Sequence, residues 1–302
     1  MKKNGRLAWD GCWTALATPF LKSGGLDEKA FARLIRLQLA GGVSGLVVCG
    51  STGESATLTH EEYRRVIELA LRESQGRAPV VAGVAANATW KAVELARECG
   101  ALGVDALLVL APYYNKPTQD GLFEHFAAVA RSTRLPVIVY NIPGRTAVNI
   151  LPQTLARMVN ACPNIGAVKE ASGNLDQVAE ILTLLPAPFA LLSGDDGLTL
   201  PMMSIGARGV VSVVSNVAPR ETQALCDAFL AGDTAKAERL HRKLFPLIKA
   251  LFVETNPIPV KTALSMMGIC GPGLRLPLTE LSRQRRPALR AALKRFGGRR
   301  NE

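Results

Sequence analysis

Short apolar runs alternate along the chain with longer segments in which apolar residues recur at helical spacing. Eight of these runs have the length of a strand, and several are apolar without interruption, which is typical of parallel strands covered on their outer face. The segments between them repeat apolar residues at i, i+3 and i+4, as Phe31, Leu34 and Ile35 do. The predicted strands are 13–17, 45–49, 80–83, 106–110, 137–140, 165–169, 189–192 and 210–213.

Eight strand–helix units, spaced by roughly 20 to 35 residues, predict an α/β fold of the (β/α)8 TIM barrel type over residues 1–230. A doubly wound sheet is the alternative, but that fold usually has fewer strands and a glycine-rich nucleotide-binding turn after the first. Here Thr18-Pro19-Phe20 follows the first strand, and neither G-x-G-x-x-G nor a Walker A pattern occurs. Beyond residue 230 only helical patterns remain, over 233–253, 257–267 and 286–296. Residues 231–302 are therefore predicted to form a C-terminal helical domain.

The net charge of +11 is concentrated near the C-terminus. Eight cations against one anion lie between Arg283 and Glu302, which accounts for +7 and leaves +4 for the rest of the chain. The body of the protein is therefore not a basic nucleic-acid surface, and we predict no nucleic-acid partner. The segment 286–296 has the apolar spacing of a solvated amphipathic helix, and a tail that binds a polyanion is the alternative.

Hydropathy and cysteine usage exclude further classes. The longest apolar run, near 106–113, is strand-sized and shorter than the roughly 18 residues of a membrane span, so no membrane association is expected. The basic start Met1-Lys2-Lys3 is interrupted by Asp10 before a signal-peptide core forms, which predicts a cytoplasmic protein. The six cysteines lie far apart with no C-x-x-C pair, which predicts reduced, mostly buried thiols and no metal site.

Lys169 is the sharpest candidate for chemistry, because it closes the apolar run 165–168 at the end where (β/α)8 barrels hold their active sites. If its side chain points into the barrel, burial favours the neutral amine, which is a nucleophile toward carbonyl carbon. The alternative is a structural lysine that points outward and pairs with Glu170 or a helix residue. All three histidines fall in predicted helices, so tyrosine and hydroxyl groups are the expected proton carriers.

Further polar groups follow neighbouring predicted strands. The turn 50–55, Gly-Ser-Thr-Gly-Glu-Ser, offers backbone N–H groups and hydroxyls to an anion. Three of the four tyrosines, Tyr113, Tyr114 and Tyr140, stand at two adjacent strand ends, and Arg145 follows the second of these. A plain tight turn and tyrosines that cap the core are the alternatives. Together with Lys169, these groups fit a Schiff-base aldolase that acts on a 2-oxo acid.

Five motifs, GSTGE at 50–54, YNIPGRT at 140–146, VKEAS at 168–172, SGDD at 193–196 and ETNPIPVK at 254–261, resemble the dihydrodipicolinate synthase / N-acetylneuraminate lyase family. The resemblance covers essentially the whole chain. It implies that Lys169 forms a covalent imine with pyruvate and that no cofactor is needed. It also implies that Tyr140 is the acid/base, and that Ser51, Tyr140 and Tyr114 form a hydroxyl relay, with Tyr114 contributed across a dimer interface.

The resemblance also implies the substrates. The N–H groups of Ser51 and Thr52 would hold the pyruvate carboxylate, Arg145 would hold the carboxylate of L-aspartate 4-semialdehyde, and Val211 belongs to the same binding set. The expected reaction condenses the two substrates to 4-hydroxy-tetrahydrodipicolinate, on the route to diaminopimelate and lysine, in a homotetramer built as a dimer of dimers. Serine at position 51 is common in the lyases of the family, so an N-acetylneuraminate or 2-keto-3-deoxy sugar acid lyase is the alternative. Arg145 favours the condensation, because those lyases typically lack it.

A regulatory pocket is the last feature that the resemblance implies. In relatives that lysine inhibits, a pocket at the dimer interface is similar to Ser55, Ala56, His60, Asn87 and Tyr113 here. A glutamate that holds the amino groups of the ligand aligns with Lys91, and Tyr63 stands where a histidine is common. Because a cation that faces a cationic ligand reverses the sign of the interaction, we expect weak or absent inhibition by lysine.

Overall fold

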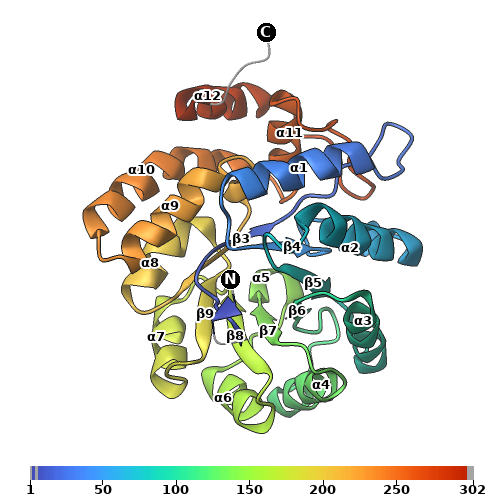
Figure 1. Cartoon of the computed structure of the whole chain (residues 1–302), viewed down its shortest axis with the longest axis vertical. Coiled ribbons are helices and arrows are strands. Elements are labelled where there is room, and N and C mark those ends of the chain that lie inside the picture. Colours follow the sequence, from blue (N-terminus) through green and yellow to red (C-terminus); the bar gives the residue numbers. More distant parts are fainter. Residues whose placement is uncertain (1, 4–5, 298–302) are drawn as a thin grey trace.

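The computed structural model describes residues 2–3 and 6–297, and its centre is a closed barrel of parallel strands in the order β10-β3-β4-β5-β6-β7-β8-β9 (Figure 1). The predicted (β/α)8 barrel is confirmed, and each predicted strand is present with its ends shifted by two residues at most. The barrel strands are β3 (Gly11–Ala15), β4 (Gly45–Val48), β5 (Val80–Val84), β6 (Ala106–Leu110), β7 (Val137–Asn141), β8 (Ile165–Glu170), β9 (Ala190–Ser193) and β10 (Gly209–Ser212).

Helices surround the barrel as a ring, and the last three lie together beyond α1 and α9 (Figure 1). Residues at the helix starts explain where the helices begin. Helix α2, for example, begins with a capping box in which the side chains of Thr59 and Glu62 each accept a hydrogen bond from the other residue's backbone N–H. The helices are α1 (Glu28–Ala40), α2 (His60–Ser74), α3 (Thr89–Leu102), α4 (Gln119–Arg131), α5 (Pro143–Thr146), α6 (Pro152–Ala161), α7 (Leu175–Leu184), α8 (Thr199–Ser204), α9 (Pro219–Leu230), α10 (Thr234–Leu251), α11 (Ile258–Met266) and α12 (Arg286–Phe296), with 3-10 turns η1 (Ser55–Thr57), η2 (Asp196–Leu198) and η3 (Val214–Asn216). The predicted C-terminal helices are thus confirmed, whereas the division into domains at residue 230 stays a prediction.

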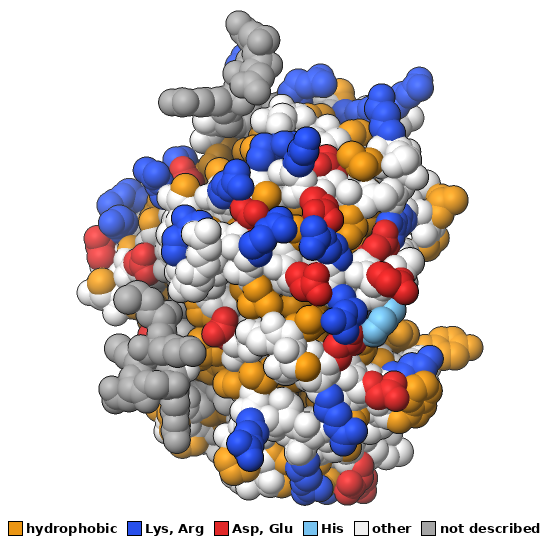
Figure 2. Space-filling model, turned by 45° about the vertical axis from the view of Figure 1, so that its right-hand side comes forward, with side chains coloured by type: hydrophobic (Ala, Val, Ile, Leu, Met, Phe, Trp, Pro, Cys, Tyr) orange, Lys and Arg blue, Asp and Glu red, His pale blue; other side chains and the backbone are white. Residues whose placement is uncertain are grey.

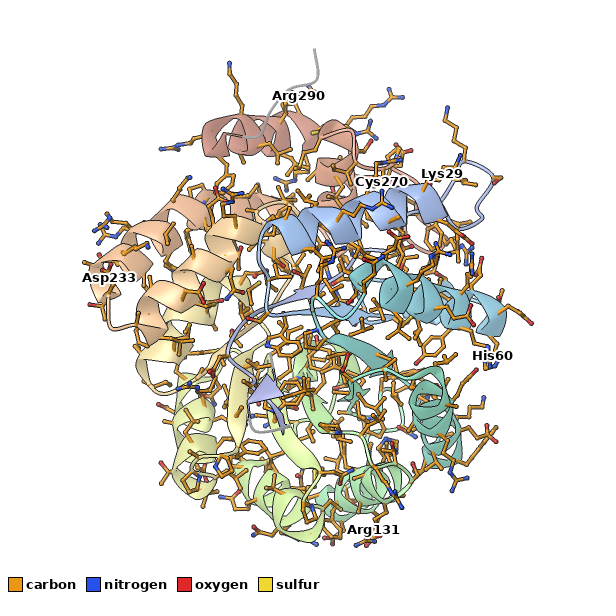
Figure 3. All side chains as sticks on the ribbon, viewed as in Figure 1. Lys29, His60, Arg131, Asp233, Cys270 and Arg290 are labelled. Carbon is orange, nitrogen blue, oxygen red and sulfur yellow. The ribbon has the colours of Figure 1, made fainter. Side chains whose placement is uncertain are left out.

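Side chains that alternate along the strands divide the core into two parts. One set packs outward against the helices, and the other fills the barrel itself (Figure 3). Trp9 and Trp13, whose ring centroids lie 5.1 Å apart, occupy the N-terminal end of the barrel. Gly45 is required there, because a Cβ at this position would lie 2.2 Å from the Trp13 ring. With that end filled, the polar groups gather at the opposite end of the strands.

The burial of the cysteines and the distribution of surface charge agree with what the sequence predicts. All six cysteines are free and buried, as predicted; Figure 3 shows Cys270 between α1 and α11. The amphipathic C-terminal helix is also confirmed, since α12 buries Leu289 and Leu293, while Arg299 and Arg300 of the predicted tail lie outside the described residues. Acidic and basic side chains are intermixed on the face in Figure 2. Among the described residues, no helix has both the length and the apolarity to span a membrane.

Candidate active site

Lys169 lies inside the barrel. Along β8, Ala167 belongs to the set that fills the barrel and Val168 to the set that packs outward, so the strand alternation directs Lys169 inward. The residue is only 6% exposed. Within the described part of the chain, no carboxylate lies within ion-pair distance of its Nζ atom. The alternative of an outward, ion-paired lysine is therefore wrong.

Tyr140 is the neighbour of Lys169 across the sheet. The two residues are register partners on β7 and β8, and Nζ of Lys169 lies 3.9 Å from the centroid of the tyrosine ring. Gly194 leaves space for the lysine, because a Cβ at this position would lie 3.1 Å from Lys169 Cε and closer still to Ala171. A buried amine beside a phenol is an arrangement suited to a nucleophile with a nearby proton carrier.

A buried polar network fixes the same two strands from the outside. Glu170, the residue after Lys169, is 1% exposed and accepts hydrogen bonds from Asn141 at 2.9 Å and Gln177 at 3.1 Å. Asn141 follows Tyr140 on β7 and is the register partner of Glu170. The outward-facing pair thus ties together the two strands whose inward-facing pair is Lys169 and Tyr140. Glu170 is committed to this network and not to the lysine.

The turn 50–54 follows β4 and offers two free donors. The N–H groups of Gly53 and Glu54 donate to carbonyls within the turn, at 3.0 and 3.1 Å. Glu54 has φ 52°, in the left-handed region, which lets the chain close tightly before η1. Among the described residues, the N–H groups of Ser51 and Thr52 donate to no protein acceptor. We call residues 50–54 the anion turn, because adjacent unpaired N–H groups of this kind suit an anion.

Asn256 joins two of the predicted binding residues, a role that sequence reasoning missed. Its side-chain nitrogen donates to the Thr52 hydroxyl at 2.9 Å, and its backbone carbonyl accepts from Nη2 of Arg145 at 3.0 Å. Arg145 lies exposed on α5 immediately after β7, so Asn256 brings the ends of β4 and β7 together. Asn256 lies within the motif ETNPIPVK at 254–261, but the resemblance assigned it no role.

Val211, the remaining predicted binding residue, lies on β10 and belongs to the set that fills the barrel. Asp196 holds the end of this strand: its carboxylate accepts from Ser212 and from the N–H groups of Val213 and Val214, the latter two at 2.9 Å. Burial raises the pKa of Asp196, and these hydrogen bonds oppose the rise. Asp196 thereby orders the backbone that follows Val211.

Tyr114 is not brought together with Lys169 in a single chain. It is 88% exposed and has φ 76°, and Tyr113 beside it is 38% exposed. Asn87 donates to the backbone carbonyl of Tyr113 at 3.4 Å and accepts from Asn115 at 2.9 Å through its own carbonyl. The two tyrosines therefore stand on the surface in a loop that other residues order.

The other residues of the predicted regulatory pocket lie in η1 and on the helices α2 and α3. Ser55 and Ala56 lie in η1, and His60 begins α2, at the edge of the molecule in Figure 3. His60 Nε2 lies 3.1 Å from a carboxylate oxygen of Glu98. Lys91 is exposed on α3, and its Nζ lies 5.2 Å from the centroid of Trp90. Among the described residues, no carboxylate forms an ion pair with Lys91.

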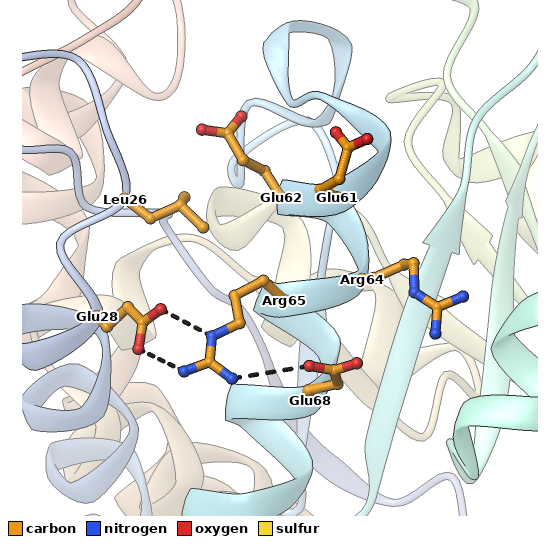
Figure 4. A pocket seen from close by; sticks show the side chains of 7 residues that line it. All are labelled: Leu26, Glu28, Glu61, Glu62, Arg64, Arg65 and Glu68. Carbon is orange, nitrogen blue, oxygen red and sulfur yellow. Dashed lines mark hydrogen bonds and ion pairs between the residues drawn. The ribbon is translucent and has the colours of Figure 1, made fainter.

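A separate surface pocket of about 420 Å³ lies between α1 and α2 (Figure 4). Arg65 occupies it, donating to both oxygens of Glu28 at 2.7 and 2.8 Å and lying 3.7 Å from Glu68. Because Arg65 is paired with Glu28 and Glu68 and none of the lining residues belongs to a barrel strand, we do not assign the pocket to the site. The described residues also contain no cluster of three or more His, Cys, Asp or Glu side chains arranged to hold a metal ion.

Comparison with known proteins gives one consistent answer. Residues 8–296 match the model of the dihydrodipicolinate synthetase family. The chain is 50% identical over 287 residues to the 4-hydroxy-tetrahydrodipicolinate synthase of Oleidesulfovibrio alaskensis, covering 95% of this chain and 98% of that protein. It superimposes on the dihydrodipicolinate synthase of Aquifex aeolicus with a TM-score of 0.95 at 47% identity, covering 97% and 100% of the two chains. A monomeric dihydrodipicolinate synthase variant matches with a TM-score of 0.94 at 43% identity, covering 96% and 97%.

Proposed function

Because the chain belongs to the dihydrodipicolinate synthetase family, we propose that it is a lyase that condenses pyruvate with L-aspartate 4-semialdehyde to 4-hydroxy-tetrahydrodipicolinate. The observation that carries this proposal is the inward, buried Lys169 against the Tyr140 ring, with no acid partner among the described residues. An amine that is directed into the barrel and tied to no carboxylate is positioned to attack a carbonyl carbon.

The proposed reaction begins at Lys169. Its amine attacks the ketone carbon of pyruvate, and loss of water from the adduct leaves a covalent imine, so no external cofactor is required. Loss of a methyl proton gives the enamine, whose terminal carbon attacks the aldehyde carbon of the second substrate and regenerates the imine. The amino group of the second substrate then attacks the imine carbon, which closes the ring and releases the Lys169 amine. Tyr140 is the proposed proton carrier for these steps, with the hydroxyl of Ser51 as the next member of the relay.

The two carboxylates are assigned to two parts of the site. The free N–H groups of Ser51 and Thr52 suit the pyruvate carboxylate, and Val211 contributes an apolar contact inside the barrel. Arg145, exposed and linked through Asn256 to the same turn, suits the carboxylate of L-aspartate 4-semialdehyde. A sugar-acid lyase would use the same imine but has no need of this arginine, so a two-substrate assay separates the activities.

The relay is proposed to be completed between two copies of the chain. Tyr114 is almost fully exposed, so its hydroxyl is available to a neighbouring copy, which supports the dimer and, with a second such pair, the homotetramer. The monomeric variant among the similar structures makes the oligomeric state a direct test. A single-copy species in solution with full activity would contradict the contribution of Tyr114.

We propose further that lysine inhibits this protein weakly or not at all, since the exposed Lys91 would face the amino groups of the ligand. Inhibition is measured by titrating lysine into the two-substrate assay. We expect Lys91→Glu to strengthen inhibition and Lys91→Gln, the matched uncharged control, to have a smaller effect. A submillimolar inhibition constant for the unaltered protein would refute the proposal.

The imine is tested by adding borohydride in the presence of pyruvate, followed by mass mapping of peptides. Reduction should leave a stable adduct on the peptide that contains Lys169, and omission of pyruvate is the control. An unmodified Lys169 peptide would exclude the Schiff-base mechanism for the synthase and for the lyase alike.

A further inference from the structure

A second buried lysine lies directly behind the anion turn. Lys261 on α11 and Glu54 of the turn form an ion pair in which both side chains are 0% exposed. The second oxygen of Glu54 accepts from the backbone N–H of Arg275 at 3.1 Å. Nζ of Lys261 also lies 4.2 Å from the ring centroid of Phe20. The pair therefore sits in a closed space, and solvent has no access to either charge.

The C-terminal segment holds the anion turn at more than this one point. Asn256 bonds the Thr52 hydroxyl, Lys261 bonds Glu54, and Arg275 donates to the carbonyl of Thr57 at 2.7 Å, just after the turn. These three residues are far from the turn in sequence: Lys261 lies on α11, Asn256 lies just before this helix, and Arg275 lies in the segment between α11 and α12. The geometry of the turn is thus fixed from behind by side chains that do not reach the barrel interior.

The charge of Glu54 makes the pairing matter for binding. A carboxylate within a turn that is to hold an anionic ligand opposes that ligand at short range, and burial weakens the screening that water would supply. Lys261 neutralises this carboxylate at contact distance and fixes its direction. Resting on the proposed function, we infer that Glu54 and Lys261 are positioning residues that align the anion turn and cancel its negative charge so that it can accept the pyruvate carboxylate.

The test compares three variants with the unaltered protein. Lys261→Met leaves Glu54 unpaired, whereas Glu54→Leu combined with Lys261→Met replaces the pair by apolar side chains and leaves no buried charge. Lys243→Met, which removes an exposed lysine 3.6 Å from Glu221, is the matched control. For each protein, KM for pyruvate, KM for the second substrate, kcat, thermal midpoint and the borohydride adduct are measured.

We expect KM for pyruvate to rise by about ten- to a hundredfold in Lys261→Met, the worth of one hydrogen bond to a charged group, while KM for the aldehyde changes much less. The double variant should recover the thermal midpoint, whereas KM for pyruvate should fall only part of the way back, because removing the charge of Glu54 does not restore the alignment of the turn. A purely structural role would restore both quantities together. The control should match the unaltered protein in all five measurements.

Two results have different meanings. If the unaltered protein forms no borohydride adduct with pyruvate, the proposed function fails and this inference fails with it. If the adduct forms on Lys169 but the folded double variant binds pyruvate as well as the unaltered protein, the inference alone is overturned. The double variant keeps the test decisive even if Lys261→Met does not fold.

Discussion

Among the residues whose burial is described, two lysines are buried, and they lie in two regions with different surroundings. Lys169 lies in the mouth of the barrel, 6% exposed, against the face of Tyr140. Lys261 lies between the barrel and the C-terminal helices, 0% exposed, and is paired with the carboxylate of Glu54. Burial alone therefore does not distinguish the proposed nucleophile from a structural lysine, whereas the group that contacts the amine does.

The contrast follows from electrostatics. Burial lowers the pKa of Lys261, and the neighbouring Glu54 carboxylate opposes that effect by favouring the cation. Lys169 has an aromatic face and space beside Gly194 instead of an anion. A cation held by a buried anion is a poor nucleophile, because its lone pair is occupied by the proton that the anion stabilises. The mouth of the barrel is suited to chemistry and the second region to alignment.

The largest expected effect comes from the same substitution at both lysines. Lys169→Met should lower kcat/KM by a factor of at least about 10³, as removal of a nucleophile does, and leave the thermal midpoint unchanged or higher. Lys261→Met should instead lower the free energy of unfolding by about 3–5 kcal/mol, because it leaves a buried carboxylate unpaired. Steady-state kinetics measures the loss of kcat/KM in each variant, and chemical denaturation measures the change in its free energy of unfolding.

The adduct provides the control for that comparison. Lys261→Met should still form the borohydride adduct on Lys169 when pyruvate is saturating, whereas Lys169→Met should form none. A catalytically active Lys169→Met, or an adduct mapped to Lys261, would break the distinction between the two regions.

A smaller effect is expected from the phenol beside the proposed nucleophile. Tyr140→Phe keeps the ring under Lys169 but removes the hydroxyl, so kcat should fall by about 10²–10⁴, the usual worth of a positioned proton carrier. Tyr63→Phe is a matched control, since Tyr63 is also 6% exposed and its hydroxyl bonds the Gly83 carbonyl at 2.9 Å. That variant should lose about 1 kcal/mol of stability and keep its kcat. Equal losses of kcat in both would deny Tyr140 a special role.

Sequence patterns predicted one of these regions much better than the other. The apolar runs indicate the barrel, and the end of the run 165–168 places Lys169 at the rim of its strand. Its inward direction depends on the alternation along β8 within a closed barrel, which a single continuous apolar run does not reveal, since both faces are covered. The outward alternative therefore stayed open until the inward set of side chains was known.

The second region was beyond sequence reasoning for a different reason. The pair of Glu54 and Lys261 joins residues that are 207 positions apart, and the bond from Asn256 to Thr52 spans 204. Local periodicity predicts the helix that carries Lys261 and the turn that carries Glu54, but not that one lies against the other. Tertiary contacts of this kind depend on how the C-terminal helices pack on the barrel, and no local spacing encodes that arrangement.

A buried histidine extends the comparison of the two lysines, and the effect expected from it, on the pH dependence of stability, is the smallest. His125 on α4 resembles Lys169 in having no acid partner among the described residues: Nδ1 lies 3.0 Å from the Thr89 hydroxyl, and Nε2 has no partner. Burial lowers the pKa of His125 from 6.5 to about 4. The folded state therefore keeps the neutral ring while the unfolded chain takes up a proton between these values. Stability should fall as the pH drops through this window, by about 3 kcal/mol at most, and should not depend on His125 above it.

Urea unfolding at pH 6.5 and pH 4 measures the loss, and His125→Gln, which does not titrate, should lose correspondingly less. An identical loss in the variant would show that burial without an acid partner does not hold this base neutral.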